Sequence, residues 1–342
     1  MTQYFLQEGT IFLNSVISSP PGAIIGPVAF VLGVIIDFIY NVVSAITPVG
    51  ALGISIIIMT IIVRTALLPT AFKMQRNMMK TREMQPEMNK IKEKYGDTKD
   101  PEMRRKMQAE MQALQSKHGV NMLASCLPML VTWPLFMGLF VVLGQAFLFV
   151  ASIGDAYSAI SSILIQQGPE FLFDVMLPIV EPTVPANMAI NLFAIDDMNR
   201  AIHVFTPENW ATIFSHFSGE ELAQITQLHA EKVAAQTFLG LNLVEPAGLA
   251  WPGIILPILS AGTMFLSQFL MSRSNPATDP QQQNMQKMMM IIFPLMFGFF
   301  TTQAAGGVGV YWVMLNVYMI VQHYFINRYY VKKDERLKAE KA

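Results

Sequence analysis

The stretch GALGISIIIMTIIVRTALL occupies residues 50–68, and it guides the interpretation of the whole chain. At ~1.5 Å per residue, a helix of this length comes close to spanning the ~30 Å hydrocarbon core of a bilayer. Its single charged residue is Arg64, which lies shortly before Pro69. We therefore expect a membrane-spanning helix with a cation near one end.

The overall composition agrees with a membrane protein. Hydrophobic residues make up 53% of the 342 residues and charged residues only 14%, whereas charged residues are roughly a quarter of an ordinary soluble protein. The mean hydropathy is +0.41. A soluble enzyme this apolar would have to bury nearly all of its surface, so the composition argues against this class. The single cysteine, Cys126, excludes an intrachain disulfide.

Other apolar blocks are long enough, or nearly so, to span the bilayer. They lie at about 122–150, 249–271, 287–302 and 308–327. A further block at about 24–46 is ambiguous. Its Asp37 and Asn41 lie four residues apart on one helical face, which favours an interfacial amphipathic helix, with a sixth span as the other interpretation.

Lysine and arginine are distributed unevenly, although the net charge is only −1. Residues 72–119 contain twelve of the 23 and residues 328–342 contain six. Residues 151–250 contain only Arg200 and Lys232, against eleven acidic residues. Because cytoplasmic loops of membrane proteins are enriched in lysine and arginine, we expect a multi-pass protein with its N-terminus outside and its C-terminus in the cytoplasm.

The spans and charges together predict an all-α integral membrane protein with five transmembrane helices. The expected segments are an extracytoplasmic N-terminal segment (1–48) with an outer interfacial amphipathic helix at about 24–46, transmembrane helix 1 (49–71), a cytoplasmic helical hairpin (72–119), transmembrane helix 2 (120–150), an extracytoplasmic segment (151–248), transmembrane helix 3 (249–271), a cytoplasmic loop (272–286), transmembrane helices 4 and 5 (287–327) and a basic cytoplasmic tail (328–342).

Residues 73–118 have the pattern of two amphipathic helices. Gly96 suits the end of the first helix, and Asp100 before Pro101 suits an N-cap with proline at the first helical position. Methionines recur at helical spacing. They could form the seam between the helices or a flexible surface that contacts substrates and partners, and these two interpretations are compatible. The methionines proposed for contact are Met78, Met88, Met103, Met107 and Met111.

Arg64 has two interpretations. It could be a snorkelling arginine near the interface, or it could face a water-filled cavity and attract an anionic group of a ligand. Thr60 lies one turn earlier on the same helical face. None of the other polar residues within the spans is acidic, so no obvious partner neutralises Arg64. These polar residues include Thr132, Gln268 and Asn316.

Several motifs in the same order resemble the YidC/Oxa membrane protein insertases. They are ISIIIMTIIVRTALLP (54–69), GVNMLASCLPMLVTWPLFMGLF (119–140), FLGLNLVEP (238–246), ILPILSAGTMFLSQFLM (255–271), MQKMMMIIFPLMFGFF (285–300) and GVYWVMLNVYMIVQHYF (309–325). The resemblance implies five core helices around a hydrophilic groove that binds substrate. The groove is then expected to contain Arg64, Thr60, Gln268, Trp312, Tyr311 and Asn316.

The resemblance also implies a function, namely an insertase or chaperone that helps nascent membrane proteins enter and fold in the bilayer, alone or with the Sec translocon. The implied partners are nascent membrane proteins, membrane lipids, the ribosome and the Sec translocon, and DNA is not among them. No cofactor and no enzymatic step are expected. The chain resembles the short Gram-positive-type bacterial form, so the expected location is the bacterial cell membrane.

The sequence contains no recognisable catalytic or metal-binding pattern. His203, His216, His229 and His323 form no group with carboxylates, and we expect them on the surface. The alternative function is a small polytopic channel or transporter. That class predicts paired intramembrane charges or internal repeats, whereas the spans contain one prominent charge and no repeat.

Overall fold

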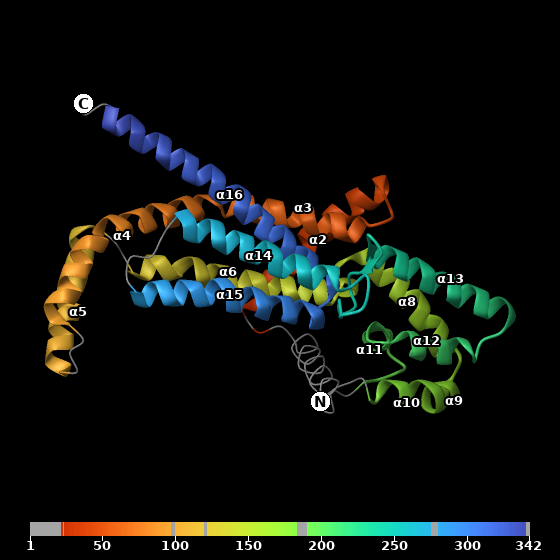
Figure 1. The fold of residues 1–342 in the computed structure, drawn as a ribbon. Helices are drawn as coiled ribbons and strands as arrows, with labels where there is room; N and C mark the ends of the chain where they lie inside the picture. Colours follow the sequence, from red (N-terminus) through yellow and green to blue (C-terminus); the bar gives the residue numbers. More distant parts are fainter. Residues whose placement is uncertain are drawn as a thin grey trace. The chain divides into compact units, whose positions relative to one another are not determined.

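The computed structural model describes residue 22 and residues 24–96, 100–119, 122–182, 190–274 and 280–339, and these residues are mostly helical (Figure 1). The chain forms two compact units. The first unit comprises Met1–Met59, Leu135–Ile258 and Phe299–Tyr311, and the second comprises Thr60–Pro134, Leu259–Gly298 and Trp312–Ala342. The expected N-terminal segment before residue 22 and the end of the basic tail at 340–342 lie outside the described residues, as does the side chain of Cys126.

Most of the chain outside residues 146–250 forms long helices. They are α2 (Ile25–Ile46), α3 (Ala51–Ala66), α4 (Leu68–Tyr95), α5 (Pro101–Lys117), α6 (Met122–Gly144), α14 (Ile255–Ser274), α15 (Pro280–Gln303) and α16 (Gly306–Ala339). The break between α3 and α4 lies next to Pro69, whose ring is incompatible with a continuous helix that would bond to the carbonyl of Thr65.

Some of these helices are long and apolar enough to cross a membrane. Among the described residues, three helices meet this requirement alone, namely Ile25–Ile46, Ile255–Arg273 and Gln283–Gln303. Two bent pairs meet it if each pair is one span, namely Ala51–Ala66 with Leu68–Thr81 (54°) and Ala151–Gln166 with Pro169–Val180 (108°). α16 is not in this set, since Asn316, Gln322 and His323 lower the hydropathy of its apolar part. The five-span arrangement and its orientation therefore stay predictions.

The helix α2 has two apolar sides. One side is buried in the first unit and includes Leu32, Ile36 and Val43. The other side exposes large apolar side chains at a spacing of four residues, a pattern that suits contact with lipid. These side chains are Phe30, Val34, Phe38 and Val42. The interfacial placement of α2 stays a prediction, with a transmembrane helix as the alternative.

The carboxylate of Asp37 has a structural role in α2. Its Oδ1 atom accepts a hydrogen bond from the backbone N–H of Ala151 at 2.9 Å, and its Oδ2 accepts one from Asn41 Nδ2 at 3.3 Å. The first bond caps the N-terminus of α8, where unpaired N–H groups favour an anion. Asp37, which we interpreted with Asn41 as the polar face of an interfacial helix, therefore binds another element of the first unit.

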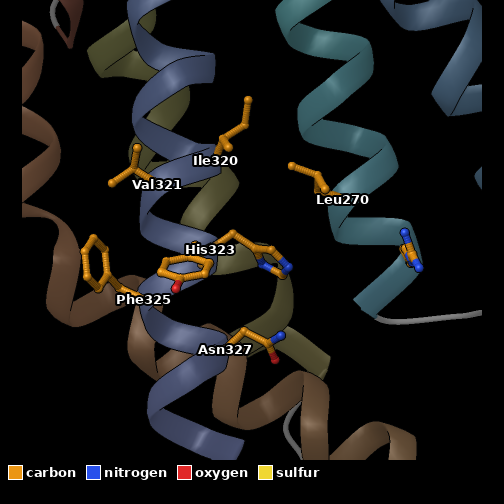
Figure 2. Close-up of a pocket in the computed structure, with 8 residues that line it drawn as sticks. Leu270, Ile320, Val321, His323, Phe325 and Asn327 are labelled. Carbon is orange, nitrogen blue, oxygen red and sulfur yellow. The ribbon is translucent and has the colours of Figure 1, made fainter.

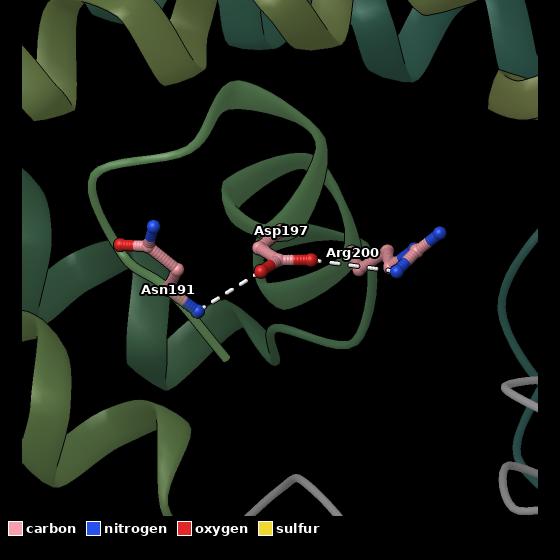
Figure 3. A network of polar contacts seen from close by, with 3 residues as sticks. All are labelled: Asn191, Asp197 and Arg200. Carbon is pink, nitrogen blue, oxygen red and sulfur yellow. Dashed lines mark hydrogen bonds and ion pairs between the residues drawn. The ribbon is translucent and has the colours of Figure 1, made fainter. Parts of the chain in front are cut away.

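Residues 146–250 form short helices and one small hairpin. They are α7 (Ala146–Phe149), α8 (Ala151–Gln166), α9 (Pro169–Phe171), the π-helical turn η1 (Leu172–Met176), α10 (Leu177–Val180), α11 (Ile195–His203), α12 (Pro207–Phe214), α13 (Gly219–Gln236), and the antiparallel strands β1 (Thr237–Phe238) and β2 (Leu241–Asn242). α8 packs against α7, α11 and α13. The start of α11 is fixed by Asp197, which accepts hydrogen bonds from the backbone N–H of Asn191 and from Arg200 (Figure 3).

The core between α8 and α13 contains polar groups that the sequence did not reveal. Lys232 is only 6% exposed, and its Nζ lies 4.8 Å from the ring centre of Tyr157 and 4.7 Å from that of Trp210. Gln236 donates to the hydroxyl of Tyr157 at 2.9 Å. A cation between two aromatic faces is stabilised by cation–π attraction, which offsets part of its desolvation.

The expectation that the histidines lie on the surface is wrong for His203. Its Nε2 lies 2.8 Å from the carbonyl oxygen of Gly144, and its Nδ1 lies 3.3 Å from the hydroxyl of Tyr157. The amide of Leu148 instead bonds to the carbonyl of Gln145. The helix expected to continue to residue 150 therefore ends at Gly144, and α7 begins after a break.

Acid is expected to destabilise this region, because burial lowers the pKa of His203 to about 4. Between pH 6.5 and 4 the unfolded histidine binds a proton that the folded one does not, so stability falls as the pH falls through this window. Across this window, His203 is expected to lower the free energy of unfolding by a total on the order of 3 kcal/mol. Burial lowers the pKa of His229 to about 4 as well, and Lys232 adds to this effect, so His229 acts in the same direction.

Hydrogen exchange of α11 and α13 at pH 7, 5 and 4 measures this effect. We expect loss of protection with acid, and His203→Gln should weaken the pH dependence. His216, which is exposed on the same segment, provides the control substitution His216→Asn, which should leave the pH dependence unchanged. Equal pH profiles for the wild type and His203→Gln would contradict the assignment.

Two stretches distant in sequence pair through their backbones in the first unit. Four hydrogen bonds of 2.7–3.2 Å join residues 243–248 to residues 302–307. Gly306 donates to the carbonyl of Glu245 at 2.8 Å, and Gly307 to that of Leu243 at 2.7 Å. A Cβ atom at Gly306 would lie 2.6 Å from the carbonyl oxygen of Asn242. This pairing therefore requires glycine at position 306.

In the second unit, α4 packs against α5 (Figure 1). Met84 and Leu114 are buried between them, with Met88 and Ile91 partly buried beside them. Lys94 and Glu110 form an ion pair across the two helices. The N-terminus of α5 has the expected cap, since the side chain of Asp100 accepts from the N–H of Glu102 at 2.9 Å.

Candidate functional site

The candidate site begins with an interhelical hydrogen bond between α14 and α16. Asn316, only 5% exposed, donates from Nδ2 to the hydroxyl oxygen of Thr263 at 3.3 Å. The hydroxyl of Thr263 donates in turn to the carbonyl of Leu259 at 2.6 Å. Amide and hydroxyl side chains bond across apolar helices in this way because an unpaired polar group there is costly.

A second polar contact joins α3 to α16. The hydroxyl groups of Thr65 and Tyr318 lie 3.1 Å apart. Further along, the hydroxyl of Tyr330 donates to the carbonyl of Phe72 at 3.1 Å, and the rings of Phe72 and Tyr329 meet edge to face. Within the second unit, α16 is therefore bonded to α3, to α4 and to α14.

Arg64 lies directly before Thr65 on α3 and is partly buried. Its Nε atom is buried and has no hydrogen-bond partner among the residues that the structure describes. Within the described residues, no ion pair involves Arg64. From the sequence, α3, α6, α14, α15 and the first 25 residues of α16 contain neither aspartate nor glutamate. Arg64 is thus a cation without a counterion among these helices, an arrangement that favours an external anion or water.

Other predicted groove residues have different environments. Thr60 is 1% exposed and Gln268 is partly exposed. Trp312 is 5% exposed, and its ring meets that of Phe297 edge to face at 5.1 Å. No hydrogen bond joins Arg64 to Gln268 in the described part of the chain.

Tyr311 belongs to the first unit. It is 2% exposed, and its buried hydroxyl has no hydrogen-bond partner among the described residues. Neighbouring residues on a helix point about 100° apart, so Tyr311 and Trp312 face different directions. Their common role in a groove stays a prediction.

Sequence reasoning missed several members of this polar set. Thr65, Thr263 and Tyr318 make interhelical contacts, yet none of them was predicted as a groove residue. Ser267 is also buried, at 3% exposure. The available signal was the presence of small hydroxyl residues in otherwise apolar helices, which is typical of helix–helix contacts in membranes.

The methionines expected to contact substrate differ in their exposure. Met88 packs against the buried pair of Met84 and Leu114, so it contributes to the seam between α4 and α5. Met103 is 44% exposed. Met84, which the predicted apolar faces did not include, is the most buried of the group, at 1% exposure. The remaining three are partly exposed, namely Met78, Met107 and Met111.

A family model described as the 60Kd inner membrane protein matches residues 44–334. The chain belongs to this family. It is the YidC/Oxa family, and the match includes every residue assigned above to the groove and to the methionine faces. Together with the apolar helices, family membership identifies an all-α membrane protein.

Curated relatives of this YidC/Oxa chain come from several bacteria. It is 28% identical over 308 residues to "Membrane protein insertase YidC 1" of Bacillus anthracis, covering 90% of this chain and 83% of that protein. It is 26% identical over 282 residues to "Membrane protein insertase MisCA" of Bacillus subtilis, covering 82% and 72%. It is 32% identical over 283 residues to "Membrane protein insertase YidC" of Dinoroseobacter shibae, covering 82% and 34%.

Proposed function

We propose that this protein is a membrane protein insertase that helps nascent membrane proteins enter and fold in the bilayer through a hydrophilic groove. Relatives that bear the name insertase match most of this chain. The observation that carries the groove proposal is Arg64, a cation in an apolar helix whose Nε has no partner among the described residues. The proposed substrate contacts are Arg64, Thr60, Gln268, Trp312, Tyr311 and Asn316.

The chemistry of insertion explains why such an arginine would help. A polar, often acidic, N-terminal tail loses its hydration when it enters a bilayer, and this desolvation is the main barrier to its passage. A groove that admits water partway across the membrane shortens the dry path. In it, Arg64 offers transient charge compensation to a carboxylate of the tail. No nucleotide and no covalent step is needed.

The polar contacts of α14 and α16 support this proposal in a second way. The hydrogen bond from Asn316 to Thr263 satisfies a buried amide without using a charged group. A groove wall of neutral polar residues can solvate a passing backbone or side chain without holding it tightly. The hydrophobicity of the following transmembrane segment then favours its release into lipid.

The remaining parts of the proposal concern partners and placement. We propose that the protein acts alone or with the Sec translocon and receives nascent chains from the ribosome. In this proposal the α4–α5 pair and the basic tail lie in the cytoplasm, where methionines such as Met103 contact substrates or partners. The expected location is the bacterial cell membrane, with the N-terminus outside.

Site-specific photo-crosslinking tests the groove. A crosslinker at Gln268, which is partly exposed on α14, should capture a nascent single-spanning protein during insertion. Leu266 is 46% exposed on the same helix, about 200° away around its axis, so a crosslinker there should give a weaker adduct. Adducts from position 266 alone in an active preparation would overturn the proposed path. Absence of any adduct together with ion conductance would favour a channel or transporter.

A further inference from the structure

A pocket of about 540 Å³ lies between α14 and α16 in the second unit. Figure 2 shows Leu270 of α14 and Ile320 and His323 of α16 pointing toward the space between the two helices. The lining is completed by Arg273, Val321, Tyr324, Phe325 and Asn327. Its volume is within the range of sites that bind small molecules, and none of the residues assigned to the groove lines it.

The lining combines two chemistries. Leu270 and Ile320 form an apolar surface between the two helices, while Arg273 and Asn327 offer N–H donors. Arg273 is exposed, and no ion pair or hydrogen bond engages it within the described residues. A ligand that fills this pocket would therefore be apolar over part of its surface and would carry an anionic group.

The surrounding sequence has the charge that such an anion requires. Between Trp251 and Tyr330 the chain contains three basic residues and a single acidic one, Asp279. Beside the pocket, Arg328 donates to the hydroxyl of Tyr324 at 2.9 Å. A second guanidinium is thus held at the rim of the pocket by one of its lining residues.

The position of the pocket along the helices indicates where the ligand comes from. Arg273 is the last residue of the apolar stretch Ile255–Arg273, which is long enough to cross a membrane. Tyr324, Phe325 and Tyr329 are each more than half exposed. Exposed aromatic rings next to arginines, at the end of an apolar stretch, are typical of the level of the lipid headgroups.

From these observations we propose that this pocket binds an anionic phospholipid. Arg273 and Asn327 hold the phosphate-containing headgroup, Arg328 contributes charge at the rim, and an acyl chain lies along Leu270 and Ile320. Guanidinium groups are suited to phosphate because their donors match its oxygens. The proposal does not depend on the insertase function.

Native mass spectrometry of the full chain in mixed nanodiscs tests the site. The probes are phosphatidylglycerol and phosphatidylcholine with identical acyl chains, so only the headgroup charge differs. The wild type should retain phosphatidylglycerol preferentially, and Arg273→Gln should reduce this retention about fivefold, the effect of one arginine at a membrane surface. Arg273→Lys keeps the charge and should restore most of the retention.

Lys287 provides the matched control. It is an exposed basic residue of α15 and does not line the pocket, so Lys287→Gln should leave retention unchanged. If Arg273→Gln and Lys287→Gln reduced phosphatidylglycerol retention equally, the proposed site would be wrong, and the retention would reflect unspecific electrostatic attraction to basic residues. Full competition by soluble glycerol phosphate would also overturn the proposal, because it would identify a site for free phosphate without the acyl chain.

Discussion

Replacing Arg64 by alanine is expected to reduce the insertion of substrates with acidic N-terminal tails by about tenfold or more. Arg64 is the cation of α3, and it has no ion pair among the described residues. Loss of one charge–charge contact in a partly dehydrated site costs about 1.4 kcal/mol or more, and this amount corresponds to a tenfold change in rate. Insertion into proteoliposomes, read out by protease protection of the tail, measures the effect.

Two controls separate this role from a structural one. Arg64→Lys keeps the charge and should retain much of the activity toward acidic tails. Substrates whose tails carry no acidic residue should be inserted by Arg64→Ala nearly as well as by the wild type. An equal loss for neutral and acidic tails would show that Arg64 supports the fold, and no loss for either would favour the snorkelling interpretation.

Gly306→Val is expected to destabilise the protein by about 3 kcal/mol or more. The added Cβ would lie 2.6 Å from the carbonyl oxygen of Asn242 and 3.2 Å from Cα of Leu243, both of them backbone atoms. Overpacking alone costs roughly 1–3 kcal/mol. Displacement of the backbone would also weaken the bonds that Gly306 and Gly307 donate, each worth about 1 kcal/mol.

Gly262 provides the matched control for this substitution. It lies within α14. A Cβ atom added at this position would have no atom of another described residue within 4 Å outside the adjacent helix backbone. Gly262→Ala should be neutral or stabilise the helix by up to about 1 kcal/mol. Denaturation of both variants in the same detergent measures the difference. A Gly306→Val protein as stable as the wild type would contradict the backbone pairing of residues 243–248 with residues 302–307.

Local patterns in the sequence predicted much of the secondary structure. The apolar stretch at 50–68 corresponds to α3, and Pro69 indicates why α4 begins as a separate helix, bent by 54°. Asp100 and Pro101 predicted the start of α5 correctly. These features depend on residues only a few positions apart, so one sequence is sufficient to identify them.

Contacts between residues that are distant in the sequence could not be predicted from local patterns. The end of α6 at Gly144 depends on His203, 59 residues away, and Asp37 caps a helix that begins 114 residues later. Both were interpreted from their own surroundings, His203 as a surface residue and Asp37 as part of a water-facing side. The methionine seam shows the same limit, because helical spacing alone did not identify Met84 as its most buried member.

Only part of the candidate site could be predicted from the sequence. Arg64 and Asn316 stand out as polar residues within apolar helices. Their partners do not, because Thr263 and Tyr318 are ordinary residues until the helices are packed together. The resemblance to the YidC/Oxa family, which the family match confirms, added Trp312 and Tyr311, which composition alone would not have selected.

Insertion by the purified protein tests the central claim most directly. The full chain, reconstituted without other proteins into liposomes, should protect the N-terminal tail of an added single-spanning substrate from protease, and protein-free liposomes should not. Insertion that requires Arg64 for acidic tails is the result that the proposed groove predicts. Equal protection in protein-free liposomes, or ion conductance without any protection, would contradict the assignment of this chain as an insertase.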